Sequence, residues 1–164
     1  MIDRYSLPEM AAVFSDTTRF GRYLEIELLV TEAQAKLGIV PAEDAAACRA
    51  NAPIIDAGFV QAVSDREAVT NHDVAAFVDV VQESIGQPAG SWIHYGLTSS
   101  DVVDTGMALQ LQRAGGLLVP AVRELAWELA QKAREYADTL CVGRTHGVHA
   151  EPTSFGLKLA GYAM

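Results

Sequence analysis

The sequence predicts an all-α fold, with a small N-terminal helical domain followed by the first part of a bundle of long helices. Apolar residues recur every three or four positions through most of the chain, which is the period of an amphipathic helix. Residues that favour helix starts and helix ends bracket these stretches. One stretch, residues 99–138, keeps this period for far longer than a small domain needs.

The N-terminal stretch predicts an irregular arm and then a helix. Residues 1–15 contain Pro8 and show no lasting periodicity. Asp16 or Thr17 is expected to cap the helix that follows, and Gly38 is expected to end it in the left-handed conformation. The apolar stripe of this helix comprises Phe20, Leu24, Leu28 and Ala35.

Three shorter helices are expected next. Pro41 favours a first helical turn, and Asn51 ends that helix. Residues 54–66 predict another helix, and Asn71 is expected to cap the one that runs to Gly86. The stripe of this last helix comprises Val74, Phe77, Val81 and Ile85.

Residues 99–138 predict a single helix roughly 60 Å long, at ~1.5 Å per residue. Its spacing of four, four and three corresponds to about 3.67 residues per turn, close to a straight helix. Gly115, Gly116 and Pro120 predict a kink rather than a break, because the stripe keeps its phase across them. Such a helix needs other long helices beside it. The stripe comprises Val103, Met107, Leu111, Ala114, Leu118, Val122, Leu125, Leu129, Ala133 and Tyr136.

The end of the chain predicts an extended segment at residues 140–142, a loop, and a new helical pattern from Phe155. That pattern stops at Met164 without a cap or a polar tail, and we therefore expect the sequence to be cut within a helix. We assign residues 1–95 to an N-terminal helical domain and residues 96–164 to the truncated first part of the long-helix bundle.

Composition excludes several classes of function. The net charge of −9 argues against nucleic-acid binding, which requires an excess of Lys and Arg. No apolar run approaches the ~18 residues of a membrane span, and the N-terminus does not resemble a secretory signal. Cys48 and Cys141 form no CxxC motif and indicate a reducing cytoplasm.

Polar residues gather in four segments that a helical core does not require. Each segment is predicted to be a loop or a helix start, where binding groups concentrate and backbone N–H groups favour anions. All four histidines of the chain lie in three of these segments. The segments are Arg4-Tyr5, Asn71-His72-Asp73, residues 94–101 and residues 143–149.

Each segment also has a purely structural interpretation. Arg4 and Tyr5 suit an exposed arm, and the Asn71 segment suits a helix cap. Thr98 and its neighbours suit a cap as well, which does not exclude binding, and His94 suits a satisfied, partly buried histidine.

Other kinds of site receive little support. The spacing of His146 and His149 suits zinc only weakly, since Gly147 lies between them and neither cysteine belongs to a ligand pair. A Ser-His-Asp triad lacks its GxSxG motif. Without GxGxxG or GxxxxGK[ST], a nucleotide cofactor is not expected.

Four motifs, RYS, HDVAAF, WIHYGLTSSDVVDT and GRTHGVHAEPTSFG, resemble the adenylosuccinate lyase family of the fumarase/aspartase superfamily. They occur in the family's order and spacing along the whole chain. The resemblance implies an all-α, cofactor-free enzyme that eliminates fumarate from adenylosuccinate, giving AMP, and from the related ribotide SAICAR, giving AICAR, in purine synthesis. It also implies a homotetramer with a shared core of long helices, in which three subunits supply each active site.

The resemblance assigns a role to each segment. It implies that Arg4 and Tyr5 contact the nucleotide phosphate and ribose, and that Asn71, His72 and Asp73 line the substrate site. Asn71 stands where some relatives carry Arg. The remaining roles are carboxylate binding for Thr98, Ser99 and Thr145, general acid for His146, and support of the site for His94, with Arg144 beside Thr145.

The chemistry suits these residue types. Cleavage of the C–N bond leaves negative charge on nitrogen, and histidine is the side chain that donates a proton near neutral pH. The family's base is a serine on a loop whose signature this sequence lacks, and it is expected beyond residue 164. Two alternatives remain open: another superfamily enzyme, such as an argininosuccinate lyase or a muconate cycloisomerase, and a non-catalytic helical oligomerisation module.

Overall fold

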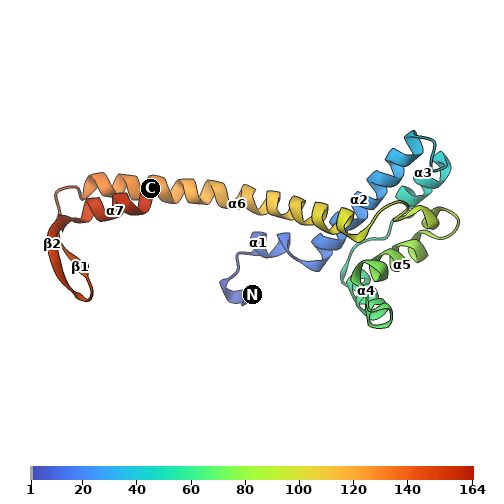
Figure 1. Cartoon of the computed structure of the whole chain (residues 1–164), viewed down its shortest axis with the longest axis horizontal. Coiled ribbons are helices and arrows are strands. Elements are labelled where there is room, and N and C mark those ends of the chain that lie inside the picture. The colour runs from blue at the N-terminus through green and yellow to red at the C-terminus, as the bar shows by residue number, and fades with distance from the viewer. Residues whose placement is uncertain (1) are drawn as a thin grey trace. The chain divides into compact units, whose positions relative to one another are not determined.

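The computed structural model describes residues 2–164 and confirms an all-α fold with one small sheet. It divides into two compact units, Met1–Ala114 and Gly115–Met164, each described by itself below (Figure 1). The domain boundary predicted between residues 95 and 96 separates the N-terminal domain from helices that are expected to pack against other subunits. It stays a prediction. The elements are η1 Asp3–Tyr5, α1 Pro8–Val13, α2 Asp16–Lys36, α3 Ala42–Ala50, α4 Ala57–Thr70, α5 Asp73–Ile85, η2 Ala89–Trp92, α6 Ser99–Glu135, β1 Leu140–Thr145, β2 Val148–Ser154 and α7 Phe155–Ala163.

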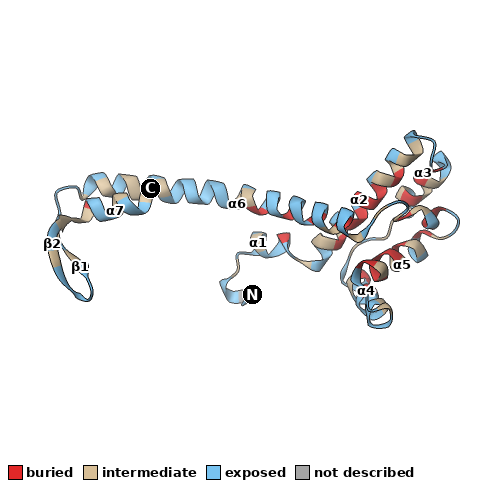
Figure 2. Ribbon diagram, in the orientation of Figure 1, coloured by how far each residue is buried: buried red, intermediate tan, exposed pale blue. Residues whose placement is uncertain are grey.

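The core of the first unit is an aromatic cluster between α2, α4 and α5. The rings of Phe20 and Phe77 stack with centroids 5.6 Å apart, and Tyr23 and Phe59 meet Phe77 edge to face. All four side chains are buried, as the red inner faces of these helices show (Figure 2). Burial raises the pKa of Tyr23, which therefore packs as a neutral aromatic residue.

The ends of α2 show one prediction that was wrong and one that is confirmed. Ser15, rather than Asp16 or Thr17, caps α2, because its hydroxyl accepts a hydrogen bond from the Thr18 N–H at 3.2 Å. Asp16 is already the first helical residue. Gly38 follows the helix with a φ of +73°, as the left-handed stop requires.

The junction of α4 and α5 reverses the predicted role of Asn71. Asn71 has a φ of +52° and closes α4 as its C-cap, so it does not cap α5. The α5 cap is His72, whose ring Nδ1 accepts from the Ala75 N–H. Helix α4 also begins later than predicted, at Ala57, after Asp56 as its N-cap. Gly86 ends α5 as expected.

Helix α6 begins at Ser99 as predicted and ends at Glu135, three residues before the predicted Asp138, with Pro120 inside it. In the first unit α6 packs on α2 through Gly106, where a Cβ would lie only 2.8 Å from Cε1 of Tyr23. One turn further on, the buried Gln110 amide donates to the carbonyl oxygen of Val13 at 2.7 Å. These contacts fix the start of α6 against the N-terminal helices.

The second unit contains a β-hairpin where a loop was expected. Strands β1 and β2 pair antiparallel from Leu140 with Ser154 to Thr145 with Val148. The register shifts between Val142 and Arg144, and Gly143 lies there because a Cβ would stand 2.9 Å from the Glu151 carbonyl oxygen. This sheet corrects the prediction, which placed only residues 140–142 in an extended segment.

Helix α7 closes back on the end of α6. Gly156 allows this approach, since a Cβ there would lie 2.7 Å from Cα of Ala137. The ring of Phe155 packs against Tyr136, with centroids 5.5 Å apart. The predicted helical pattern from Phe155 is therefore confirmed.

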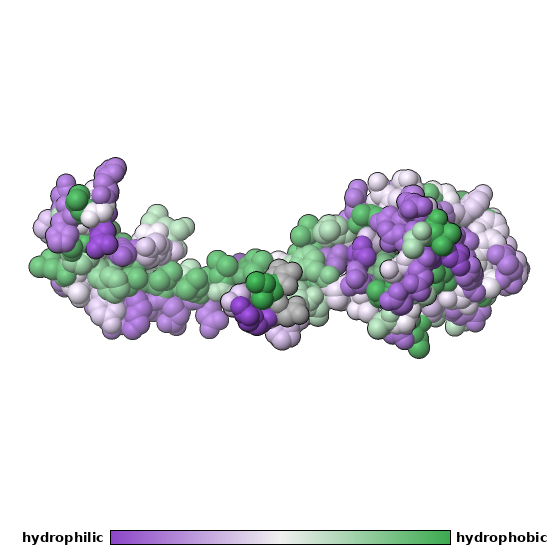
Figure 3. All heavy atoms as spheres, turned by 90° about the horizontal axis from the view of Figure 1, so that it is seen from below, coloured by the Kyte–Doolittle hydropathy of each residue, from purple (hydrophilic) through white to green (hydrophobic). Residues whose placement is uncertain are grey.

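The part of α6 that belongs to the second unit carries large exposed apolar side chains. Leu118, Val122, Leu125 and Trp127 each keep more than half of their surface accessible. Figure 3 shows hydrophobic surface along the extended part of the chain. Among residues 2–164, no helix is both long enough and apolar enough to cross a membrane.

Candidate functional site

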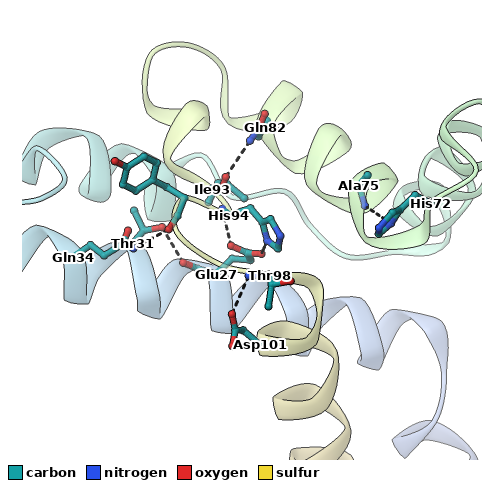
Figure 4. Close-up of polar contacts among 11 residues, drawn as sticks. Glu27, Thr31, Gln34, His72, Ala75, Gln82, Ile93, His94, Thr98 and Asp101 are labelled. Atoms are coloured by element: carbon teal, nitrogen blue, oxygen red, sulfur yellow. Dashed lines mark hydrogen bonds and ion pairs between the residues drawn. The ribbon is translucent and has the colours of Figure 1, made fainter.

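In the loop before α6, the His94 ring contacts the buried carboxylate of Glu27. Glu27 of α2 has no exposed side-chain surface, and its Oε1 lies 2.7 Å from Nδ1 of His94. Its second oxygen, Oε2, accepts the backbone N–H of His94 at 2.8 Å. The Glu27 carboxylate therefore accepts a hydrogen bond from the backbone of His94 and also contacts the His94 ring (Figure 4). The His94 side chain keeps 23% of its surface exposed.

Two further side chains hold the backbone on either side of His94. Gln82 of α5 donates to the carbonyl oxygen of Ile93 at 3.0 Å, and Gln34 of α2 donates to that of Tyr95 at 2.8 Å. Between them His94 has a φ of +68°, a left-handed conformation that non-glycine residues rarely adopt. The surrounding structure thus maintains an unfavourable backbone conformation at a histidine.

The start of α6 is capped from within the helix. The Asp101 carboxylate accepts the Thr98 N–H at 2.9 Å, and the Asp101 N–H donates to the Thr98 carbonyl oxygen at 3.0 Å. No hydrogen bond of the Thr98 or Ser99 hydroxyl is found within the described part of the chain. The cap therefore leaves both predicted carboxylate-binding hydroxyls available.

His72 has a structural role whatever else it binds. Because its Nδ1 accepts the Ala75 N–H at 3.3 Å, the ring proton of neutral His72 is on Nε2. Asp73 lies 3.5 Å from the same Nδ1, but an ion pair there would require a proton on the capping nitrogen. We favour the cap, since a positive charge at a helix N-terminus opposes the helix dipole. Asn71, His72 and Asp73 are all exposed.

Arg4 and Tyr5 lie together at the N-terminal turn η1. The Arg4 guanidinium stands over the Tyr5 ring at 4.8 Å from the centroid, and its Nη2 donates to the Tyr5 hydroxyl at 3.1 Å. Both side chains are exposed. The pair therefore presents a positive charge and an aromatic face side by side, which suits a phosphorylated nucleoside.

The second unit holds the predicted acid at the tip of the hairpin. His146 and Gly147 are the two turn residues, with φ values of +53° and +75°. Positive φ at both positions defines a type I′ turn, which suits the twist of a two-residue hairpin. Arg144 pairs directly with His149, so these two side chains share one face of the hairpin. Arg144, Thr145, His146 and His149 are all exposed.

The predicted residues thus divide between the two units. His94, Thr98 and Ser99 belong to one loop and the helix that follows it, and Arg144, Thr145 and His146 belong to one strand and its turn. Within residues 2–164 no group of three or more His, Cys, Asp or Glu side chains gathers as a metal site.

Sequence reasoning missed Glu27. A signal was present, because Glu27 lies seven residues after Phe20 and three after Leu24, in the middle of the core-facing stripe of its helix. A carboxylate at such a position needs a partner. Its partner, His94, is 67 residues away in sequence, and nothing local connects them.

Comparison with known proteins agrees with this architecture. A family model described as "Lyase" matches residues 4–164. The chain belongs to this lyase family. Among curated members of the superfamily, the adenylosuccinate lyase of Bacillus subtilis (strain 168) is 46% identical over 160 residues, which cover 98% of this chain and 36% of that protein. The chain spans about a third of the length of the curated lyases it matches.

Solved structures of this superfamily share the fold. The 3-carboxy-cis,cis-muconate lactonizing enzyme from Pseudomonas putida aligns with a TM-score of 0.86 and 35% identity, over 99% of this chain and 38% of that one. The fumarate lyase from Mesorhizobium sp. BNC1 aligns with a TM-score of 0.80 and 31% identity, over 94% and 36%.

Proposed function

We propose that this lyase chain is the N-terminal part of an enzyme that eliminates fumarate from adenylosuccinate and from SAICAR, leaving AMP and AICAR. The observation that carries the proposal is the 46% identity to the Bacillus subtilis adenylosuccinate lyase over 98% of this chain. The stacked Arg4 and Tyr5 add to it, because a guanidinium beside an aromatic ring suits a nucleotide better than a small dicarboxylate.

The proposed reaction moves one proton off carbon and one onto nitrogen. A base removes a proton from the carbon beside a carboxylate, the electron pair forms the C=C bond of fumarate, and the C–N bond breaks. His146 donates the proton that the departing nitrogen takes up. Its place at an exposed turn tip lets the ring enter a site without disturbing a packed core. The base is supplied by a part of the enzyme outside this chain.

The other residues bind and orient the substrate. Thr98 and Ser99 offer hydroxyls at the start of α6, where backbone N–H groups also favour an anion. Thr145 and Arg144 hold a carboxylate beside His146. Asn71, His72 and Asp73 line the site at the α4–α5 junction, and His94 contributes its outer ring nitrogen.

The proposed assembly is a homotetramer in which several subunits complete each active site. The exposed apolar residues of α6, among them Leu118, Val122 and Leu125, support an assembly, because a monomer rarely exposes so much contiguous apolar surface. We place the enzyme in the cytoplasm, where thiols such as Cys48 and Cys141, both free, remain reduced.

The test is a chimera in which this chain replaces the matching third of the Bacillus subtilis enzyme. We expect the chimera to cleave adenylosuccinate, followed by absorbance. His146→Ala should lower kcat by about 10²–10⁴, the usual contribution of a general acid, with a far smaller change in KM. His149→Ala is the matched control and should reduce the rate much less.

The outcomes show whether His146 or His149 is the acid, and which of two substrates the enzyme acts on. If folded His146→Ala kept near-normal kcat while His149→Ala lost it, the two roles would have to be exchanged. If the chimera folded by circular dichroism but acted on 3-carboxy-cis,cis-muconate and not on adenylosuccinate, the alternative suggested by the Pseudomonas putida structure would replace the proposal.

A further inference from the structure

The Glu27–His94 contact is more than a surface ion pair. Glu27 is completely buried, and it meets two nitrogens of one residue, the backbone N and ring Nδ1 of His94, at 2.8 and 2.7 Å. An ionised carboxylate only accepts hydrogen bonds. Because the second oxygen already accepts a backbone N–H, an ionised Glu27 can bond to Nδ1 through its first oxygen only where Nδ1 carries the proton.

The opposite ring nitrogen is left free. No hydrogen bond to Nε2 of His94 is found among residues 2–164, and this atom is not among the buried polar atoms that lack a partner. The ring also retains 23% exposure. Nε2 is therefore the nitrogen of His94 that remains accessible for a ligand, and the hydrogen bond on Nδ1 determines which tautomer presents it.

The surroundings make this orientation rigid. Gln82 and Gln34 hold the carbonyl oxygens on either side of His94. His94 itself has a positive φ, and its ring contacts Glu27 of α2. Figure 4 shows these contacts converging on the loop from two helices. Such redundant support is typical of a side chain that must be held in place for a ligand.

We propose that Glu27 is a positioning residue that keeps the proton of His94 on Nδ1 and thereby presents Nε2 to the substrate. Only the last step, contact of Nε2 with a substrate, rests on the proposed function. Glu27 itself touches no substrate, since it has no exposed surface. Its effect passes through the ring of His94.

The tautomer can be measured on the chain itself. The chain has four histidines, so histidine labelled with ¹⁵N in the ring gives few NMR signals, which single His→Gln variants assign. The ¹⁵N shifts of the two ring nitrogens report which one carries the proton. If the chain assembles into large particles, the sedimented sample gives the same shifts by solid-state NMR.

We expect neutral His94 to carry its proton on Nδ1. Glu27→Gln offers one acceptor instead of two and removes the charge, so the ratio of Nδ1-protonated to Nε2-protonated ring should fall about tenfold or more. Glu32→Gln is the matched control, because Glu32 lies on the same helix and pairs with Arg49 at 2.7 Å without touching His94. It should leave the His94 signals unchanged.

Two results would overturn the proposal. One is a wild-type spectrum in which Nδ1 of His94 carries no proton, which would mean that a protonated Glu27 donates a hydrogen bond to Nδ1. The other is a Glu27→Gln spectrum in which the His94 tautomer ratio is unchanged. Should Glu27→Gln fail to fold, the wild-type spectrum alone still decides where the proton lies.

Kinetics in the chimera test the last step separately. Glu27→Gln should lower kcat/KM about tenfold or more, as loss of an orienting partner of a histidine does, and Glu32→Gln should not. Full activity of Glu27→Gln would show that Nε2 is not presented to the substrate. An inactive parent chimera would contradict the proposed function, while the NMR result would still decide the role of Glu27.

Discussion

The contact between α6 and α2 at Gly106 allows a quantitative test of the packing. Gly106 is buried, and an added Cβ would lie 2.8 Å from Cε1 and 3.0 Å from Cδ1 of Tyr23. The Tyr23 ring cannot retreat easily, because Phe20 and Phe77 lie edge to face against it, with centroids 6.0 and 5.7 Å away. The perturbation we choose is Gly106→Ala.

Two opposing effects determine the result. Alanine in a helix interior is favoured over glycine by about 1 kcal/mol. Forcing a methyl group into a packed core costs about 1–3 kcal/mol, and the two rings that lie edge to face against Tyr23 place this site toward the upper end. Gly106→Ala should therefore destabilise the chain by about 1–2 kcal/mol. Gly116→Ala is the control: no atom lies within 4 Å of its added Cβ, so it should stabilise by about 0.5–1 kcal/mol.

Urea unfolding followed by circular dichroism measures both variants at one protein concentration. With an m-value of about 2 kcal/mol per molar, Gly106→Ala should lower the urea midpoint by about 0.5–1 M. Gly116→Ala should raise it by about 0.25–0.5 M. A stabilised Gly106→Ala would show that helix propensity outweighs the contact with Tyr23, and the packing argument at this site would be wrong.

Three further predictions concern association, pH and thiol chemistry. The 164-residue chain should release no fumarate and should associate through the apolar side of α6. Leu125→Lys should weaken this association. Sedimentation of the unmodified chain as a monodisperse monomer would contradict the predicted association. The hydrogen bond from Arg49 lowers the pKa of Glu32, so its stabilisation is present above the ordinary value of 4.5 and disappears as the pH falls through the folded-state pKa. Arg49→Ala should accordingly lower the Tm by at most a few degrees at pH 7, because the pair is partly exposed, and by less at pH 3. Burial raises the pKa of the Cys48 thiol, so a thiol reagent should modify Cys141 quickly and Cys48 only after unfolding; rapid reaction of both in the folded chain would be inconsistent with this core.

The helices were predictable because burial imposes a period on the sequence. The stripe of Val74, Phe77, Val81 and Ile85 is buried in the structure as predicted, and Gly38 and Gly86 end their helices. The error at Asn71 arose because asparagine suits both an N-cap and a left-handed C-cap. Propensity alone does not separate these roles. In the structure the next residue, His72, caps α5 with its side chain, and Asn71 ends α4.

The hairpin was missed for a physical reason. Its strands are largely exposed, so no buried face imposes alternation on them, and the shift at Gly143 interrupts the register. Its turn, His146-Gly147, carries only half of the usual Asn-Gly signal. The candidate site residues themselves could be chosen from motifs, but the contact of His94 with Glu27 depends on the packing of α2 against a distant loop.

That contact also limits how this chain can change by mutation. Replacing His94 alone would leave the buried Glu27 carboxylate without its ring partner. Replacing Glu27 alone would remove a contact that supports His94 in an unfavourable backbone conformation. Each single replacement should therefore lower the stability of the fold, whereas joint replacement by an uncharged pair should lower it less. A library that randomises both codons at once should therefore contain more stable combinations than libraries that randomise either codon alone.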